Sequence, residues 1–529
     1  MRAIKVASQT WIVGCAYALA LFVALAGTTC AETPGGTTLV VAVPADPQHF
    51  NPGITTGSHT HSVADSLFNG LVALDRTARP IPDLAQSWTI EDGGRVYRFN
   101  LAKGARWHDG RPVTANDVVF TFNEVLLKHH ARTKASLSPV LDAIEAPDPE
   151  TVVFRMKRPY AALLQQLDVT EAPILPKHIY EGKDPNTAPA NLQPVGSGPY
   201  KLDSYKRDDL IAVVRNPDYF KPGLPRLDRI VFRVIPDERT AALALLKGEI
   251  DFMRDVAGPD LSPLKRDANV VLDQVTAGAG GGNCIMTVGF NLEKSALADI
   301  RVRRAFALTI DRARIQADVI FGQGRVAESP ISSGIGFAHA PGVLKDFKRD
   351  PAAAKLLLDD AGLKPGEGGV RLKIDIVHFP QFSRYSDAMR QDLAEVGIVL
   401  TPRPLDRAAT IETVFSKREF DTTLISYCNG LDPEIGVRRM YVSSNIAKVP
   451  FSNAAAYRSA EVDRLFDEAA ASTEPTVRGA AYRKLQEILA RDLPYWWLVE
   501  TDFTVAYRAR FEGFTPWSGQ FAEQARLKP

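Results

Sequence analysis

Residues 107–120 read Trp-His-Asp-Gly-Arg-Pro-Val-Thr-Ala-Asn-Asp-Val-Val-Phe. The Asp109-Gly110 pair predicts a tight turn, because Gly adopts the backbone angles that such turns require. Thr114 stands three residues before Asp117, a capping-box variant with Asp in place of Glu, and this spacing predicts a helix beginning there. The expected helix carries its apolar residues at Val118, Val119, Phe122, Val125 and Leu126.

Strands are predicted on both sides of this turn and helix. Residues 95–101 alternate between apolar and polar side chains, which indicates a half-buried strand, and residues 151–156 predict a second one. Residues 37–43 form a β-branched apolar run typical of a buried strand. Further strands are expected at 211–214, 230–235, 285–290 and 372–377, and helices at 241–246, 301–320, 351–361 and 385–396. Interspersed strands and helices without an internal repeat define an α/β class with more than one sheet.

The composition is that of a globular protein. The chain has 529 residues, enough for three or four domains or one large fold with insertions. Hydrophobic residues make up 45% and charged residues 24%, which excludes a disordered, collagen-like or coiled-coil chain. With 63 basic and 62 acidic residues, there is no electrostatic reason to expect a nucleic acid or an anionic membrane as partner.

The first 31 residues have the pattern of a secretory signal peptide. Arg2 and Lys5 precede an apolar run at 11–26, and small residues follow at 27–31, with cleavage expected after Ala26 or Ala31. A membrane anchor is the alternative, but this run is short for a helix that must span about 20 residues. Lipid attachment at Cys30 is a second, less favoured alternative, because residues 27–29 do not match the usual lipoprotein processing pattern.

Two cysteines remain after such cleavage. Cys284 and Cys428 form an even pair in an oxidising compartment, so a disulfide is expected, with two buried free thiols as the alternative. No His lies near either cysteine in the sequence, and the pair alone is too small a ligand set for zinc.

Catalytic and cofactor motifs are absent from the sequence. There is no phosphate-binding P-loop, no Gly-x-Ser-x-Gly elbow and no His-Glu-x-x-His motif, and Gly278–Gly282 fails the dinucleotide fingerprint. His59 and His61, with His49 upstream, form at most a weak metal candidate on a strand or polar loop, and His130 is expected at a solvated helix end. We therefore expect a binding protein without enzymatic activity, cofactor or metal.

Several segments carry a family resemblance in the same order along the chain. They are Pro82–Trp88, Tyr97–Leu101, Trp107–Phe120, Val195–Tyr200, Arg215–Phe220, Lys247–Asp251, Phe290-Asn291, Asp299–Phe306 and Ile310–Arg312. On these segments the chain resembles the solute-binding proteins of bacterial ABC importers, family 5, a class that includes periplasmic dipeptide-, oligopeptide- and nickel-binding proteins.

The resemblance implies a two-lobed periplasmic binding protein fold, class II-like, with an extra N-terminal subdomain. By analogy, lobe I takes residues 32–76, 182–283 and 504–529, the extra subdomain 77–181 and lobe II 284–503, with hinge crossings near 283 and 503. A small solute or peptide would bind between the lobes and be delivered to the ABC permease membrane subunits. The protein would be a periplasmic monomer.

The resemblance also implies where the ligand binds. In peptide-binding members an Asp shortly after an aromatic residue pairs with the peptide ammonium. Here the aromatic is Tyr427, the matching position is Asn429 or Gly430, and the nearest carboxylate is Asp432. An unpaired buried ammonium is costly, so Asn429 favours a ligand with hydroxyls or amides.

Three further ligand residues are implied. Arg384 matches an arginine that contacts a ligand carboxylate, and His49 and Asn51 follow the first strand at the position that faces the cleft. Core packing is the alternative for Tyr427, and a surface position for Arg384. The pair Cys284 and Cys428 resembles a disulfide of oligopeptide-binding members.

Two other functions are alternatives to solute delivery. A secreted hydrolase would need a nucleophile or metal constellation that the sequence does not contain. A solute sensor on the same two lobes would report to a partner other than a permease.

Overall fold

The computed structural model describes residues 37–55, 57–276, 283–446 and 451–529. The signal peptide predicted at 1–31, Cys30 and the Gly278–Gly282 segment lie outside these residues. Among the described helices, none combines the length and apolar character needed to cross a membrane.

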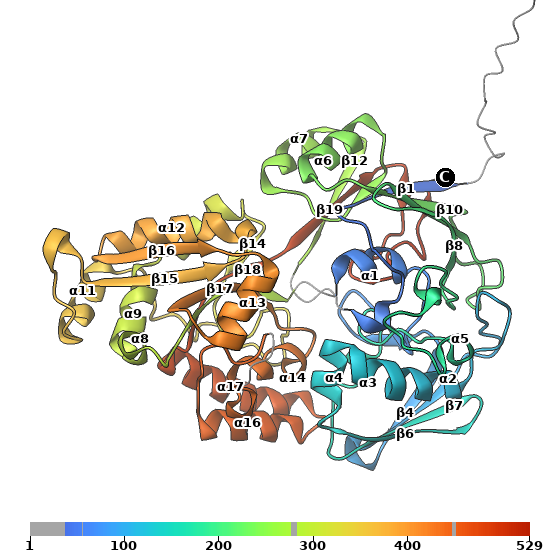
Figure 1. The fold of residues 1–529 in the computed structure, drawn as a ribbon, viewed down its shortest axis with the longest axis horizontal. Helices are drawn as coiled ribbons and strands as arrows, with labels where there is room; N and C mark the ends of the chain where they lie inside the picture. Colours follow the sequence, from blue (N-terminus) through green and yellow to red (C-terminus); the bar gives the residue numbers. More distant parts are fainter. Residues whose placement is uncertain (1–36, 56, 277–282, 447–450) are drawn as a thin grey trace, which may run out of the picture. The chain divides into compact units, whose positions relative to one another are not determined.

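A seven-stranded sheet has the order β12-β19-β11-β1-β10-β9-β8 (Figure 1). The first predicted strand is β1, which lies parallel to both β10 and β11 in the middle of this sheet. Its strands are β1 (Thr38–Val43), β8 (Tyr200–Lys206), β9 (Leu210–Arg215), β10 (Arg229–Val234), β11 (Phe252–Met253), β12 (Val270–Val275) and β19 (Phe503–Arg508).

A six-stranded sheet has the order β14-β18-β13-β17-β15-β16. Its central strands β13 and β17 are antiparallel, and their register sets Cys284 directly opposite Cys428. Its strands are β13 (Cys284–Phe290), β14 (Gly324–Val326), β15 (Leu372–His378), β16 (Ile398–Pro404), β17 (Thr422–Cys428) and β18 (Tyr495–Thr501). The chain passes between the two large sheets twice, from β12 to β13 and from β18 to β19.

A third, four-stranded antiparallel sheet lies next to the turn and helix of residues 107–120. Its order is β4-β5-β7-β6, formed by β4 (Ala85–Glu91), β5 (Val96–Leu101), β6 (Leu141–Asp148) and β7 (Thr151–Met156). The predicted helix is α2 (Ala115–Phe120), continued by a π-helix at Thr121–Leu126. The Thr114 backbone N–H donates to Asp117 Oδ2 at 2.8 Å, as the capping-box spacing predicts.

Two turns join this third sheet to the seven-stranded one. The His108 backbone N–H donates to Gly196 O at 2.7 Å, and the Gly196 N–H donates to His108 Nδ1 at 3.2 Å. This acceptor role leaves the ring proton on Nε2, which donates to Gly198 O at 3.1 Å. Burial lowers the pKa of His108 to about 4, so the imidazole is neutral and acts as a fixed connector.

The remaining elements cover these sheets. The longer helices are α1 (Ser58–Ala64), α4 (Ala131–Leu137), α6 (Glu238–Lys247), α7 (Leu261–Arg266), α9 (Ile300–Thr309), α11 (Pro351–Asp360), α12 (Ser383–Ala394), α16 (Ala460–Ala470) and α17 (Pro475–Asp492). The shorter ones are α3 (Leu127–His129), α5 (Lys177–Tyr180), α8 (Ser295–Ala298), α10 (Arg312–Arg314), α13 (Arg407–Ile411), α14 (Pro433–Gly436) and α15 (Arg438–Tyr441). Two-stranded ribbons pair β2 (Val72–Leu74) with β3 (Pro80–Pro82) and β20 (Phe511–Glu512) with β21 (Arg526–Leu527).

Each large sheet has its own hydrophobic core. One contiguous buried cluster runs from Ile285 to Val499 and belongs to the six-stranded sheet. The four-stranded sheet has another, from Leu71 to Ile174, and the seven-stranded sheet packs two clusters on its faces. Separate cores joined by few chain crossings are typical of independently packed domains.

Three local predictions were wrong. The helix expected at 301–320 stops at Thr309, because Ile310 is extended and Asp311 accepts a hydrogen bond from the Arg314 N–H at 2.9 Å, which begins a new helix. His59 and His61 lie in α1, not on a strand or loop. His130 is fully buried and caps α4, so it is not solvated.

Candidate functional site

The end of β17 and the segment that follows it contain three of the expected ligand residues. The chain leaves the six-stranded sheet at Cys428, which forms the expected disulfide with Cys284. Residues 429–432 then lead into α14. The disulfide fixes the start of this segment to β13, so Tyr427, Asn429 and Asp432 are held on a rigid support.

Tyr427 packs into the core of the six-stranded sheet. It is 1% exposed, and its ring meets the Tyr495 ring edge-on with centroids 6.0 Å apart. Its hydroxyl is buried and makes no hydrogen bond with any described residue, and the nearby Tyr495 side chain adds to the rise in its pKa. Burial raises the pKa of Tyr427 well above its usual value, so the hydroxyl keeps its proton and remains a donor.

Asn429 links the segment after β17 to a neighbouring loop through hydrogen bonds. Its Oδ1 accepts the Ser332 backbone N–H at 2.7 Å, and its own backbone N–H donates to Asn283 O at 2.8 Å. The side chain is 1% exposed. Its carbonyl oxygen is therefore engaged within the protein.

Asp432 forms a buried ion pair with Arg478 of α17. The two guanidinium nitrogens Nη1 and Nη2 donate to its two oxygens at 2.6 and 2.7 Å. Asp432 Oδ1 also accepts the Glu434 backbone N–H at 3.0 Å and so begins α14. A carboxylate with both oxygens bound in this way is not available to pair with a ligand ammonium.

Glu434 extends this buried network. The Tyr482 hydroxyl donates to Glu434 Oε1 at 3.2 Å, and Arg438 lies 3.5 Å from Oε2. Burial raises the pKa of Glu434 to about 7, Arg438 opposes the shift, and the Asp432 charge adds to it. The carboxyl group therefore changes charge close to neutral pH.

The structure places His49 and Asn51 together in the loop after β1, and Arg384 on another element, α12. Asn51 is fully buried, where its Nδ2 donates to Asn191 Oδ1 at 3.0 Å and its Oδ1 accepts the Gly53 N–H at 3.0 Å. His49 is half-buried, its Nδ1 accepts the Asn51 N–H at 3.2 Å, and burial lowers its pKa. Arg384 is an exposed residue at the start of α12.

Arg384 contacts a ring rather than a carboxylate. Its guanidinium carbon lies 5.5 Å from the centroid of the Phe321 ring, within the range of a cation–π contact. This contact uses the face of the guanidinium group and leaves its N–H donors directed elsewhere.

Sequence reasoning missed two arginines of this region. Arg478 lies 46 residues from its partner Asp432, and no local pattern indicates the pairing. Arg439 follows Arg438 on α15. The two adjacent arginines shortly after Asp432-Pro433 were the feature of the sequence that could have marked Arg439 as a candidate. Arg439 donates from Nε to Gly436 O at 3.2 Å.

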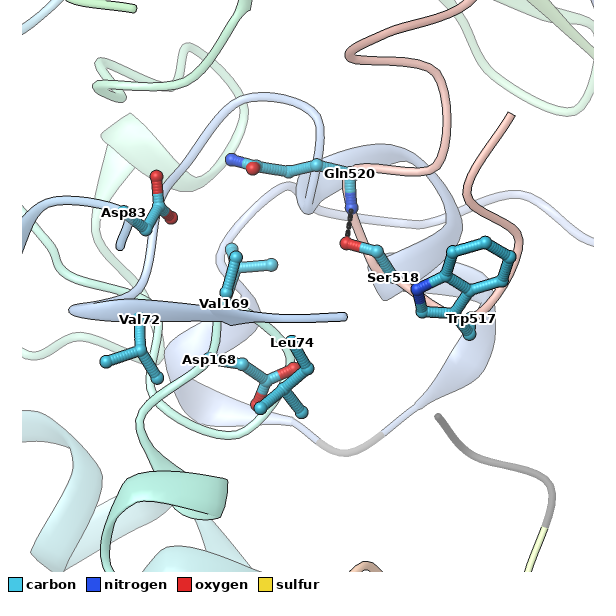
Figure 2. A pocket seen from close by; sticks show the side chains of 9 residues that line it. Val72, Leu74, Asp83, Asp168, Val169, Trp517, Ser518 and Gln520 are labelled. Carbon is cyan, nitrogen blue, oxygen red and sulfur yellow. Dashed lines mark hydrogen bonds between the residues drawn. The ribbon is translucent and has the colours of Figure 1, made fainter. Parts of the chain in front are cut away.

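A small interior cavity lies beside the seven-stranded sheet's core. Figure 2 shows its lining, with Asp83 and Asp168 on one side and Trp517, Ser518 and Gln520 on the other. Its volume of about 10 Å³ is that of a single water molecule and excludes an organic solute. Burial raises the pKa of Asp83 to about 6 and that of Asp168 to about 7.

A larger hollow lies on the six-stranded part. Its volume is about 490 Å³, and it shares no lining residue with the Tyr427–Asp432 segment. The lining residues are Leu292, Ile300, Arg303, Arg304, Tyr457, Arg458, Arg491 and Asp492. Arg303 is engaged by backbone carbonyls, and Asp492 accepts the Tyr457 hydroxyl at 2.7 Å.

The described residues contain no group of three or more His, Cys, Asp or Glu side chains that could hold a metal ion. His61 is engaged by the Asp65 carboxylate, with Nδ1 2.8 Å from Oδ1. Burial lowers its pKa, but the charge and hydrogen bond of Asp65 outweigh burial, so the net pKa is raised. This pairing gives the imidazole a structural role.

Comparison with known proteins identifies the class. Residues 79–448, more than half of the chain, match the family model of bacterial extracellular solute-binding proteins, family 5. The chain therefore belongs to this family, whose members are solute-binding transport proteins rather than enzymes.

Individual relatives agree with this assignment over nearly the whole chain. Protein XP55 of Streptomyces lividans is 30% identical, with 93% of this chain and 90% of that protein covered. The oligopeptide-binding protein AppA of Bacillus subtilis is 28% identical, with 90% and 89% covered. The ABC transporter-associated periplasmic binding protein DppA of Helicobacter pylori, solved with the peptide STSA, aligns with a TM-score of 0.78 at 24% identity, covering 93% of this chain and 98% of that one.

These matches confirm the predicted fold class, a two-lobed α/β binding protein of family 5. They also confirm the predicted function at the level of class. The chain is the substrate-binding subunit of an ABC importer.

Proposed function

We propose that this protein captures a small polar organic solute, peptide-like or of another kind, between its two lobes and delivers it unaltered to the permease subunits. The observation that supports this most directly is the rigid segment after β17, which the disulfide and the Asp432–Arg478 pair hold at the edge of one lobe. A fixed recognition surface of this kind favours binding because little side-chain entropy is lost when a ligand arrives.

The proposed lobes follow the sheets. Lobe I comprises residues 32–76, 182–283 and 504–529, and the extra subdomain comprises 77–181. Lobe II comprises residues 284–503. The membership of β1, β8 to β12 and β19 in one sheet and of β13 to β18 in another supports these boundaries. The crossings near 283 and 503 would then act as the hinge that closes the lobes on the solute.

The proposed ligand contacts are Tyr427, Asn429, Arg384 and His49. Asp432 and Asn51 belong to the same site as positioning residues, since their polar atoms are engaged by Arg478 and by Asn191 and Gly53. In this proposal Asp432 acts through the shape of the loop and not through a direct charge on the ligand.

The protein is proposed to work in the periplasm as a monomer after removal of residues 1–31. N-terminal sequencing of the exported protein tests the cleavage, and light scattering tests the monomer. Retention of residues 1–31 or a stable dimer would contradict these parts of the proposal.

Capture itself is tested on protein purified without refolding. Native mass spectrometry is expected to detect a co-purifying small molecule, and a panel of peptides, sugars, opines and metal chelates is expected to contain solutes that raise the melting temperature. A solute at 100 times its dissociation constant adds about 2.7 kcal/mol to the free energy of unfolding. Recovery of the bound solute chemically unchanged supports delivery, whereas its turnover would indicate an enzyme.

A further inference from the structure

Two neighbouring arginines of α15 have different partners. Arg438 lies 2.6 Å from Asp467 and 3.5 Å from Glu434, so its charge is compensated by carboxylates. Arg439 has no carboxylate of the described residues within 4.0 Å of its nitrogens, and its one side-chain hydrogen bond goes to the backbone oxygen of Gly436. Arg439 is half-buried, which makes an uncompensated charge costly.

The position of Arg439 is fixed by the surrounding chain. Its carbonyl oxygen accepts the Asn445 side-chain N–H at 2.7 Å, and its guanidinium carbon lies 5.9 Å from the centroid of the Phe451 ring. The guanidinium group is therefore oriented before any ligand binds, and the N–H donors on both terminal nitrogens remain unused among the described residues.

The groups around Arg439 connect both parts of the molecule. Burial lowers its pKa, Tyr427 and Glu171 oppose this shift, and Arg132 adds to it. Arg132 and Glu171 belong to the part that carries the four-stranded sheet, where they pair with each other at 3.0 Å.

The carboxylates of this region are already engaged. Asp432 binds Arg478, Glu171 binds Arg132, and Glu434 contacts Arg438 and Tyr482. Among the described residues, Arg439 therefore has no carboxylate within 4.0 Å of its nitrogens. A ligand ammonium would find no free carboxylate among these groups, whereas a ligand carboxylate would meet the unused terminal N–H donors of Arg439.

We propose that Arg439 binds a carboxylate of the transported solute, and that the solute is therefore an organic anion with net negative charge at neutral pH. A guanidinium group binds a carboxylate through paired N–H donors. This inference rests on the proposed function and names its solute class.

The test uses probes in matched charge states. Di- and tripeptides are supplied as free zwitterions, as N-acetylated acids and as C-terminal amides, together with uronic acids, dicarboxylates and neutral sugars. Melting temperature is the first readout, and calorimetry then gives dissociation constants for the compounds that bind. The strongest binders are expected among the anions. The amide of each such anion is expected to bind at least 10-fold more weakly than the free acid.

Variants separate recognition from folding. Arg439→Gln is expected to weaken binding of the anions at least 10-fold, and Arg439→Lys to restore part of the loss. Arg464→Gln is the control, because Arg464 is an exposed arginine paired with Glu468 at 2.8 Å. Without solute, Arg439→Gln is expected to melt within about 2 °C of this control, since no carboxylate loses its partner.

The outcomes divide clearly. Strongest binding by cations or neutral compounds, or wild-type affinity in Arg439→Gln, would overturn the inference and leave the capture of a solute standing. If no probe binds and no small molecule co-purifies, both the inference and the proposed function fail.

Discussion

The Asp432 carboxylate lies against the Arg478 guanidinium, with nitrogen–oxygen distances of 2.6 and 2.7 Å and both side chains almost fully buried. The sequence made Asp432 a candidate for a ligand ammonium, because it was the nearest carboxylate to Tyr427. Its actual partner lies on α17, so the pair joins the loop after β17 to a helix elsewhere in the chain. This relationship changes what a substitution of Asp432 is expected to do.

Asp432→Ala should destabilise the protein itself. The substitution leaves the Arg478 guanidinium buried without a counter-charge and removes the acceptor that begins α14, which together cost about 3–5 kcal/mol. Urea denaturation monitored by circular dichroism measures the loss. The double variant Asp432→Ala/Arg478→Met should regain part of it, because no buried charge is then left alone. An unchanged unfolding midpoint in the single variant would contradict the structural role of the pair.

Removal of the disulfide should also lower stability. Cys284 and Cys428 close a loop with a sequence separation of 144, and loss of a disulfide of this kind costs about 2–4 kcal/mol. The variant Cys284→Ser/Cys428→Ser is expected to unfold at lower urea concentration, with the solute dissociation constant also raised, because β17 anchors the Tyr427–Asp432 segment. Peptide mapping without reductant should recover the linked pair. Two titratable thiols in the unfolded, unreduced wild type would show that the bond does not form.

Features encoded by local spacing could be predicted from the sequence. The turn and capping box of 107–120 depend on residues within a few positions of one another, and the structure has both. The strand at 37–43 was recognisable because a buried central strand is apolar on both faces. The expected helix at 301–320 failed at Ile310, where an apolar residue continued the pattern although Asp311 begins a new helix.

The site was harder to predict because its chemistry depends on distant partners. Asp432 and Asn51 have the residue types expected of ligand contacts, but Arg478 and Asn191 engage their polar atoms, and these partners lie 46 and 140 positions away. His130 was taken for a solvated residue, since nothing in the neighbouring sequence reveals that Thr133 and the surrounding core enclose it. Charge pairing of this kind is decided by tertiary packing.

A third prediction follows from the close approach of the Gly196 and Leu67 backbones. A Cβ atom at this position would lie 1.7 Å from the Leu67 carbonyl oxygen, a contact that only backbone movement can relieve. Because the Gly196 turn also bonds His108, Gly196→Ala is expected to destabilise the junction of the two sheets by about 2 kcal/mol or more. Gly336→Ala is the control, because an added Cβ there meets nothing within 4 Å. Equal melting temperatures for the two variants would contradict the close approach.

The last prediction concerns pH and Asp168, which borders the small cavity in Figure 2. Burial, with the charges of Glu171 and Asp65, raises the pKa of Asp168 from 3.8 to about 7. Between these two values the folded protein holds a proton that the unfolded chain has released. Stability therefore falls as pH rises through this interval, and the loss is complete above about pH 7.

Asp168→Asn should remove this dependence of stability on pH, since the amide carries no charge. Its oxygen can still accept the Glu171 N–H, which donates to Asp168 Oδ1 at 3.2 Å in the wild type. The variant is expected to match the wild type near pH 4 and to exceed it by about 1–3 kcal/mol at pH 8, less than the full shift implies because Asp168 is only half-buried. Urea denaturation at both pH values measures the difference, with Asp387→Asn at an exposed ion pair as the control. A variant that is less stable than the wild type at pH 8 would mean that the folded protein favours the Asp168 carboxylate, the reverse of the expected sign.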